Sequence, residues 1–246
     1  PDNANHLVKQ AGVQLDAGQQ DEALKLFEQA LILDPDNVDA LFHRSNMRIL
    51  QGRPEQAKSD LERCLRLRPN HTMARLRLAA VLVPMEDLDG AKQQLDACGE
   101  DSSEVQSYRG ELVFAQGQVG QALACFEEAL QLEPTNPTPY VNAAMALLNS
   151  APAPGQMPDT TRACDLLEQA IRVDPQFAAA YVHLGQIRLG LATTLDTART
   201  VVELYDQGLE NCRTAEEVKE LCGMRVLAVA QVEAAEMLKM DTFSLN

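Results

Sequence analysis

Small and bulky apolar residues recur at a fixed spacing along this chain of 246 residues. In the first copy, Ala23 is followed by Phe27 four residues later, by Ala30 after three more, and by Pro35 after another five. Three further copies keep the order small, bulky, small, proline: Ala57, Leu61, Cys64 and Pro69; Ala122, Phe126, Ala129 and Pro134; and Ala163, Leu167, Ala170 and Pro175. Apolar positions three and four residues apart share one face of a helix, so each copy predicts an amphipathic helix that proline brings to an end.

Two degenerate copies, which lack the proline, extend the pattern: Ala91, Leu95 and Cys98, and Val201, Tyr205 and Gly208. The steps from Ala23 to Ala57 and from Ala57 to Ala91 are both 34 residues. A 34-residue period with this pattern resembles the tetratricopeptide repeat, a helix–turn–helix unit. Glycine adopts a left-handed backbone most easily, so the turn inside a unit is expected at Gly18, Gly52 and Gly117.

This resemblance implies an all-α fold: an α-solenoid of about six tetratricopeptide helix–turn–helix repeats with a C-terminal capping helix, forming a single array over residues 1–246. The expected repeats are 4–37, 38–71, 72–102, 103–136, 137–176 and 177–213, and the capping helix is 214–239. Thr214 and Glu217 form a capping box that is expected to open this last helix. Pro1-Asp2-Asn3 matches Pro35-Asp36-Asn37 one period later, so we expect the chain to be a fragment of a longer array.

Departures from the period predict where connections shorten or lengthen. The step from Ala91 to Ala122 is 31 residues, which predicts a short connection near residues 99–103. The step from Ala122 to Ala163 is 41 residues, and the excess falls on the proline-rich segment 150–158, which cannot be helical. We expect this segment to be a loop between the two helices of the fifth repeat, outside the stack.

Composition bounds the function. The chain has 21 Lys+Arg against 36 Asp+Glu, a formal charge of −15, which argues against nucleic-acid binding and suits basic partners. No apolar stretch approaches the length of a transmembrane helix, so the chain by itself is expected to be soluble, with any anchor outside it. Nucleophile elbows, phosphate loops and dinucleotide fingerprints are absent from the sequence, so we expect neither an enzyme nor a cofactor.

Cysteine and histidine usage gives no sign of a special site. The six cysteines form no CxxC pair, and they are expected to be buried apolar thiols in a protein of a reducing compartment. The four histidines lie far apart, without neighbouring Cys or carboxylate at metal-ligand spacing. Zinc needs three or four converging ligands, so no metal site is expected.

The first helix of each unit lines the inner groove of such an array, which predicts the residues that contact a ligand. This predicted groove set consists of Phe42, His43, Asn46, Met73, Leu76, Arg77, Glu104, Tyr108, Glu111, Phe114, Val141, Asn142, Met145, His183 and Gln186, with Val182 beside them. Met and apolar side chains mixed with polar ones suit a peptide or an amphipathic helix. The apolar members equally fit packing between repeats, and the two glutamates equally fit ordinary solvated carboxylates.

Charge is unevenly distributed. Between Arg44 and Arg77 lie nine Lys+Arg and only three Asp+Glu. This basic run fits an acceptor for an acidic tail or an adjacent domain, and equally a solvated face. Chaperone-binding arrays grip a terminal carboxylate with a full set of Lys, Asn and Arg, of which this chain has only the scattered members Asn46, Arg77 and Asn142.

A closer resemblance rests on several segments: His43-Arg44, Ile49-Leu50, Ala57, Asp60, the run Cys64 to Pro69, Leu132-Glu133-Pro134, Tyr140-Val141, and Val232, Glu233 and Ala235 in the last helix. In order and spacing, these segments are similar to the C-terminal half of the seventy-kilodalton receptor of the mitochondrial outer-membrane protein translocase. The resemblance implies a client-binding array on the cytosolic side of the mitochondrial outer membrane, held there by an anchor outside this chain.

The partners implied by that resemblance are mitochondrial precursor proteins, through presequences or internal targeting segments, together with other translocase subunits. Heat-shock chaperones would dock on an N-terminal clamp that this chain lacks, and neither nucleic acid nor direct membrane contact is implied. The alternative is a chaperone adaptor or a general protein-interaction scaffold that shares only the repeat.

Overall fold

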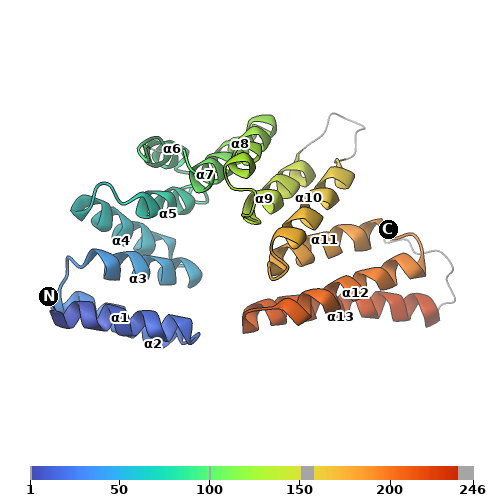
Figure 1. The fold of residues 1–246 in the computed structure, drawn as a ribbon, viewed down its shortest axis with the longest axis horizontal. Coiled ribbons are helices and arrows are strands. Elements are labelled where there is room, and N and C mark those ends of the chain that lie inside the picture. The colour runs from blue at the N-terminus through green and yellow to red at the C-terminus, as the bar shows by residue number, and fades with distance from the viewer. Residues whose placement is uncertain (1, 100, 151–157, 238–246) are drawn as a thin grey trace. The chain divides into compact units, whose positions relative to one another are not determined.

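The computed structural model describes residues 2–99, 101–150 and 158–237. Within these ranges the regular structure consists of thirteen α-helices and no strand. The helices are α1 (Asp2–Asp16), α2 (Gln20–Leu33), α3 (Val38–Leu50), α4 (Pro54–Leu67), α5 (Thr72–Leu82), α6 (Leu88–Asp96), α7 (Ser103–Ala115), α8 (Val119–Leu132), α9 (Thr138–Asn149), α10 (Thr160–Val173), α11 (Ala178–Leu191), α12 (Leu195–Asn211) and α13 (Ala215–Met237) (Figure 1). Most of the expected proline-rich loop and the expected end of the last helix at Lys239 lie outside the described residues.

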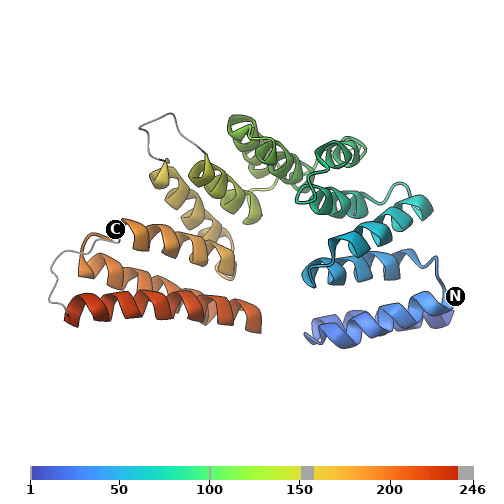
Figure 2. The same cartoon turned by 180° about the vertical axis from the view of Figure 1, so that it is seen from behind.

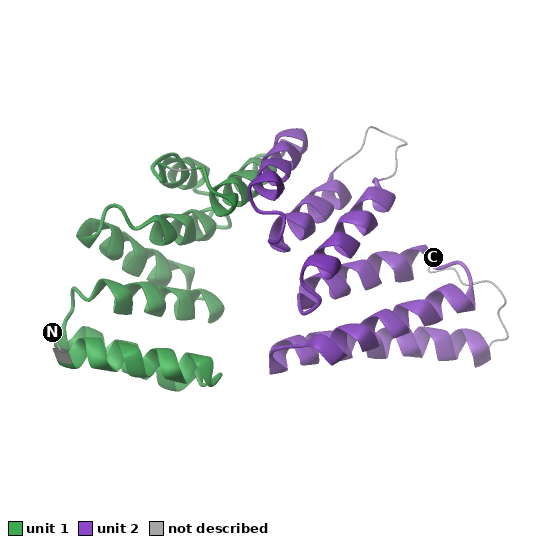
Figure 3. Ribbon diagram, in the orientation of Figure 1, with its two compact units in different colours: residues 1–116 green, residues 117–246 purple. Residues whose placement is uncertain are grey.

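The chain divides into two compact units, residues 1–116 and residues 117–246 (Figure 3). In the first unit, α1 packs on α2, α3 on α4 and α5 on α6 as helical hairpins, and α7 packs on α5 and α6. In the second, α9 pairs with α10 and α11 with α12, α8 packs on α9, and α13 packs on α11 and α12 (Figure 2). Each unit is therefore the stack of neighbouring helical hairpins that the period predicts, while a single array over the whole chain stays a prediction.

The turns that follow α1, α3 and α7 are left-handed at the expected glycines. Gly18, Gly52 and Gly117 have φ angles of 73°, 67° and 79°. In the third hairpin the same role falls to Glu86, with φ 63°, which the sequence pattern did not single out. The expected capping box also forms, because the Thr214 hydroxyl accepts the Glu217 N–H at 3.2 Å and a Glu217 carboxylate oxygen accepts the Thr214 N–H at 2.9 Å.

The same type of hydrogen bond stabilises three of the turns that connect one repeat to the next. The sixth residue after the proline donates to that proline's carbonyl oxygen: Arg75 to Pro69 at 2.8 Å, Tyr140 to Pro134 at 3.3 Å and Tyr181 to Pro175 at 3.0 Å. Backbone carbonyls just beyond a helix end have no partner within that helix. The side chain from the next helix therefore gives the proline carbonyl a hydrogen-bond partner, and it links the turn to the start of that helix.

The core consists of the small and bulky residues of the repeat pattern. Ala23, Ala30, Ala57, Leu61, Cys64, Ala122, Ala129, Ala163, Leu167 and Ala170 have no exposed surface, and Phe27 and Phe126 are 1% exposed. The degenerate last copy is buried as well, with Val201 and Tyr205 at 0%. The sequence pattern thus predicted the packed face of the second helix in each hairpin.

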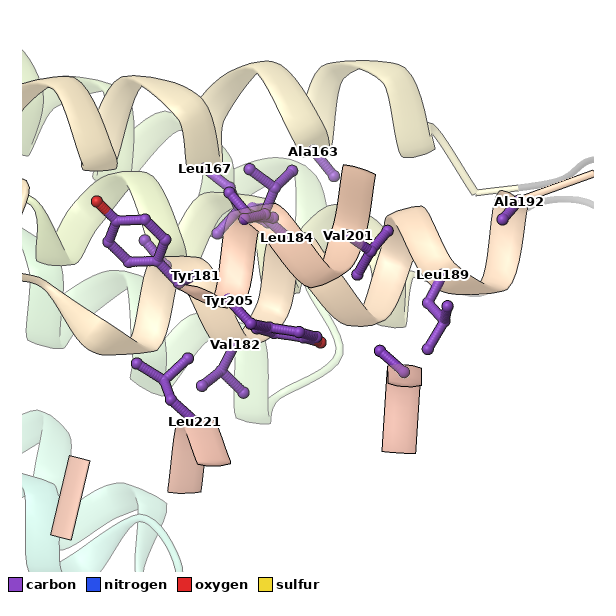
Figure 4. Close-up of a cluster of buried hydrophobic side chains, with 14 of the residues drawn as sticks. Ala163, Leu167, Tyr181, Val182, Leu184, Leu189, Ala192, Val201, Tyr205 and Leu221 are labelled. Atoms are coloured by element: carbon purple, nitrogen blue, oxygen red, sulfur yellow. The ribbon is translucent and has the colours of Figure 1, made fainter. Parts of the chain in front are cut away.

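Two tyrosines dominate the core of the second unit. Tyr181 on α11 and Tyr205 on α12 are both fully buried, among Leu184 and Leu221 (Figure 4). Gly185 on α11 leaves room for the Tyr205 ring, because a methyl carbon built on Gly185 would lie 2.3 Å from Tyr205 Cζ. The absence of a side chain at Gly185 therefore lets α11 and α12 approach each other across this ring.

The hydroxyl groups of these tyrosines differ. Tyr181 donates to the Pro175 carbonyl, whereas the buried Tyr205 hydroxyl has no hydrogen-bond partner among the described residues. Burial raises the pKa of the Tyr205 phenol to about 12. A buried polar group without a partner costs free energy, so the Tyr205 hydroxyl destabilises a core that its ring stabilises.

We therefore expect Tyr205→Phe to raise the free energy of unfolding by about 1 kcal/mol and Tyr181→Phe to lower it by about the same amount. In the wild type, a pKa raised above 10 keeps the folded form protonated while the unfolded form ionises. Stability is therefore fully present below pH 10 and falls between pH 10 and 12, by at most about 1.4 kcal/mol per pH unit from this group. Urea unfolding at pH 7 and pH 11 measures both effects. If Tyr205→Phe lost as much free energy of unfolding between pH 7 and pH 11 as the wild type does, the Tyr205 phenol would not be the source of the pH dependence.

The cysteines only partly match their expected burial. All six are free, and Cys64 is fully buried as expected. Cys98, Cys125, Cys164 and Cys212 are half-buried, and the expectation is wrong for Cys222, which is exposed on α13. The reason is that, within the described chain, α13 is covered on one side only.

Candidate functional site

Three helices of the first unit bring most of the predicted groove set together. They are the first helices of successive hairpins, α3, α5 and α7, which contact one another in chain order. We call the unit 1 surface the side chains of Phe42, Asn46, Met73, Arg77, Glu104, Tyr108, Glu111 and Phe114. Met73, 42% exposed, and Glu104 are open to solvent, and the others are half-buried. These three neighbouring helices therefore carry apolar, acidic and hydrogen-bonding groups that are exposed or half-buried.

A hydrogen bond links α5 to α7 within this surface. Arg77 Nη1 donates to the Tyr108 hydroxyl at 3.3 Å. Burial raises the pKa of the Tyr108 phenol, the nearby Arg77 charge opposes that rise, and Glu111 and Glu104 add to it. Arg77 Nε and Asn46 Oδ1 are buried and have no hydrogen-bond partner within the described residues. Arg77 and Asn46 thus retain hydrogen-bonding capacity that unit 1 leaves unused.

An aromatic cluster lies beside the unit 1 surface, where α2, α3 and the start of α5 meet. His43 stacks on Phe27 of α2, with ring centroids 5.3 Å apart and planes 11° apart, and its edge meets Phe42 at 5.5 Å. Phe42 in turn lies 5.0 Å from His71, whose Nδ1 accepts the Ala74 N–H at the start of α5. Burial lowers the pKa of both imidazoles. These neutral rings therefore hold α2, α3 and α5 together, and one face of His43 is occupied by Phe27.

Two members of the predicted groove set lie in the core, as does Val182 beside them. Leu76 on α5 is 1% exposed and Val141 on α9 is 6% exposed. Each packs inside its own unit, Leu76 with the first core cluster and Val141 with the second. For Leu76 and Val141, the alternative given in the sequence analysis therefore applies: these apolar side chains pack between helices and do not line a groove.

The remaining members lie in the second unit, on α9 and α11. Asn142, Met145 and His183 are half-buried, and Gln186 is exposed. Gln186 Nε2 lies 3.7 Å from Met224 Sδ, so α11 reaches α13 through this contact. The predicted groove set included no α13 residue, although the largely apolar segment from Leu221 to Val229, in which Arg225 is the one charged residue, was a signal that could have indicated one.

The basic run is used mainly inside the first unit. Seven of its nine basic residues have partners there: Arg44 and Arg48 with Asp60, Lys58 with Asp87, Arg63 with Asp36, Arg68 with Asp39, Arg75 with Gln94 and the Pro69 carbonyl, and Arg77 with Tyr108. The excess of positive charge therefore balances carboxylates and carbonyls of neighbouring helices.

Asp60 is the centre of the strongest of these contacts. It lies on α4 and is 4% exposed. Arg44 of α3 donates from Nε and Nη2 to its two oxygens at 2.9 and 2.7 Å, and Arg48, one turn later, donates to Oδ2 at 2.6 Å. A buried carboxylate needs such paired donors, so this cluster holds the second hairpin together.

Three hollows in the described part of the chain lie away from the predicted groove set. They belong to the first unit, have volumes of about 500, 440 and 310 Å³, and lie on α1 with α2, on α6, and among α4, α5 and α6. None of these three is lined by a residue of the predicted groove set. Across the described ranges, no three His, Cys, Asp or Glu side chains are grouped to hold a metal ion, and no helix combines the length and apolar composition of a bilayer-spanning segment.

Comparison with known families supports the repeat assignment. A model described as a tetratricopeptide repeat-like domain matches residues 38–150, and a tetratricopeptide repeat model matches residues 8–57. The TPR repeat-containing thioredoxin TTL4 of Arabidopsis thaliana is 30% identical over 126 residues, which are 50% of this chain and 17% of that protein. The chain thus spans a small part of that relative, and it contains no CxxC pair of its own.

Solved structures share the fold at low identity. A tetratricopeptide repeat protein from Parabacteroides merdae is 20% identical with a TM-score of 0.73, covering 92% of this chain and 85% of that one. Yeast Tom70 is 21% identical with a TM-score of 0.66, covering 95% of this chain and 48% of Tom70. At such identity the likeness establishes the fold alone. The thirteen helices of the described residues, the buried repeat pattern and the models matching residues 8–150 together show that this chain has the all-α fold of tetratricopeptide repeats.

Proposed function

We propose that the unit 1 surface binds a segment of a partner protein and that the chain acts as a scaffold rather than as a catalyst. The observation that carries the proposal is that the hydrogen bond from Arg77 to Tyr108 joins α5 to α7, and that one turn earlier on each of these helices Met73 and Glu104 are exposed. Repeat stacks provide extended surfaces instead of enclosed pockets. Such a surface suits recognition of a peptide better than chemistry on a small molecule.

The chemistry of the unit 1 surface indicates the class of segment. The Met73 thioether adapts to apolar side chains of different shapes. Glu104 offers a carboxylate to Lys or Arg, and Arg77 and Tyr108 offer hydrogen bonds to backbone or amide groups. A short peptide or amphipathic helix that carries apolar and basic side chains matches all of these groups.

A finer candidate is a mitochondrial import receptor. Under this proposal, the bound segments are presequences or internal targeting segments of mitochondrial precursor proteins, which are basic and amphipathic. The protein would lie on the cytosolic side of the outer membrane with other translocase subunits, and chaperones would dock outside this chain. Support comes from the structural likeness to yeast Tom70 over 95% of this chain and from the formal charge of −15. The general scaffold has the broader support. The descriptions of both family models and of the Parabacteroides merdae structure name tetratricopeptide repeats and do not mention mitochondrial import.

Charge reversal on α7 tests the proposed binding. We expect Glu104→Arg combined with Glu111→Arg to weaken binding of a basic presequence peptide about tenfold, because two attractions at the surface become repulsions. Isothermal titration calorimetry at low and high salt measures this change. The salt dependence of the affinity should also decrease.

A matched control separates the site from net charge. Asp21→Arg combined with Glu28→Arg makes the same charge change on exposed residues of α2, in the same unit. If both double variants weakened peptide binding equally, the cause would be the net charge of the protein and not contact with Glu104 and Glu111. Unchanged affinity in the α7 variant, with its circular dichroism spectrum intact, would remove Glu104 and Glu111 from the site.

A further inference from the structure

Helix α13 carries apolar residues on two opposite sides. One side is buried against α11 and α12 through Leu221, Ala228, Val232 and Ala235. The other side is open: Val218 is 40% exposed, Val226 63%, Leu227 55% and Met237 84%, with Cys222 and Ala230 exposed among them. Val218, Cys222 and Val226 follow one another at four-residue steps, so they form a stripe along one side of the helix.

The neighbouring helix α11 shows how much of a largely apolar helix is buried when other helices cover both of its sides. In α11, which has helices on both sides, seven of 14 residues are buried, whereas in α13 only four of 23 are. A helix that is apolar all round is typically covered all round. The described chain covers one side of α13, although between Leu221 and Ala235 only Arg225 and Glu233 are charged, so that apolar residues also occupy its open side.

The charges beside this stripe indicate the kind of cover. Glu216, Glu220 and Glu233 are exposed, and within the described ranges they form no hydrogen bond or ion pair. Other charges of α13 are already paired inside the unit, Arg225 with Asp206 and Glu236 with Arg199. Residues 117–246 as a whole contain eight Lys+Arg against seventeen Asp+Glu. Within the described ranges, the exposed charges of α13 without a partner are these three glutamates and Lys219, so the charge that accompanies the open apolar residues is predominantly acidic.

We propose that the open side of α13 is a second docking surface, and that it binds an amphipathic helix of a protein partner whose apolar stripe is flanked by Lys and Arg. A second copy of this chain fits less well, because pairing two α13 helices would bring the glutamates of both copies together, and like charges across an interface oppose association. This surface lies on another unit and another helix than the unit 1 surface, so it does not depend on the function proposed above.

The test uses the full chain and a defined probe. The probe is an 18-residue helical peptide of Leu and Lys with its leucines on one face, which carries a photoreactive benzoylphenylalanine in the leucine face. Cross-linked sites are mapped by mass spectrometry. The expected result is adducts on α13 that Val226→Glu with Leu227→Glu reduces at least tenfold. Because both side chains are exposed, the fold should be unchanged by circular dichroism.

The control variant places the same change elsewhere. Val13 is 64% exposed and Leu33 58% exposed, so Val13→Glu with Leu33→Glu matches the α13 variant in chemistry and exposure, in the first unit. It should leave the α13 adducts unchanged. Replacing Glu216, Glu220 and Glu233 with Gln should reduce the α13 adducts at least threefold at low salt and have little effect at high salt, as expected for attraction between charges.

The outcomes separate the two proposals. Absence of adducts on α13, or adducts that persist in Val226→Glu with Leu227→Glu, overturns the α13 surface. Sedimentation that shows a dimer which this variant dissociates also overturns it, in favour of a second copy as the occupant. Adducts on α13 without any on α3, α5 or α7 support the α13 surface while counting against the unit 1 surface.

Discussion

Replacing Gly185 with alanine is expected to lower the free energy of unfolding by about 3 kcal/mol, the upper part of the range for overpacked cores. The added methyl carbon would lie 2.3 Å from Tyr205 Cζ and 2.4 Å from its hydroxyl oxygen. Both residues are fully enclosed between α11 and α12, so the ring has no free space in which to move aside. Urea unfolding followed by circular dichroism measures the loss.

The same helix provides the control. Gly190 lies five residues further along α11, is exposed, and has no neighbouring atom within 4 Å of a built methyl carbon. Gly190→Ala should therefore raise stability by about 1 kcal/mol through helix propensity alone. If the clash is the cause, Tyr205→Leu in the Gly185→Ala background should recover part of the loss. A Gly185→Ala protein as stable as the wild type would show that the Tyr205 ring is not confined as described.

Replacing Asp60 with alanine is expected to cost about 3 kcal/mol or more, because it leaves Arg44 and Arg48 without their shared carboxylate. The Asp60 side chain is 5% exposed and those of the two arginines are 19% and 17% exposed, so water only partly replaces the lost partner. The effect should be measurable as a lower urea midpoint for the full chain.

An exposed ion pair serves as the comparison. Asp36 and Arg63 contact at 2.8 Å, but their side chains are 64% and 43% exposed. Asp36→Ala should therefore change the free energy of unfolding by less than about 1 kcal/mol. Similar losses for Asp36→Ala and Asp60→Ala would mean that burial does not set the strength of these pairs, contrary to the argument for Asp60.

The helices and their packed faces follow from the sequence because the repeat imposes them locally. Ala23, Phe27 and Ala30 are spaced for one helical face, and the prolines and Gly18, Gly52 and Gly117 mark where chain direction changes. These are short-range preferences, which a pattern reveals directly. The division into units at residues 116 and 117 depends on how the helices pack in space, and no local pattern contains that information.

The candidate site was less predictable, for an identifiable reason. Helical spacing places a residue on a face, but it does not say how closely the neighbouring helix approaches. Leu76 and Arg77 are adjacent on α5, and the first is 1% exposed whereas the second reaches Tyr108 on α7. The partners of the basic run were also hidden from the sequence, since Arg63 and Asp36 lie 27 residues apart.

In the described part of each unit, the helices that pack closely on one another are neighbours or next but one in the chain. Substitution effects should then remain local, as in other stacks of repeats. The helices α3, α5 and α7 could accordingly be redesigned for a new peptide without altering the tyrosine core of α11 and α12. This protein is in that respect a set of separately adjustable modules, suited to the engineering of one binding preference at a time.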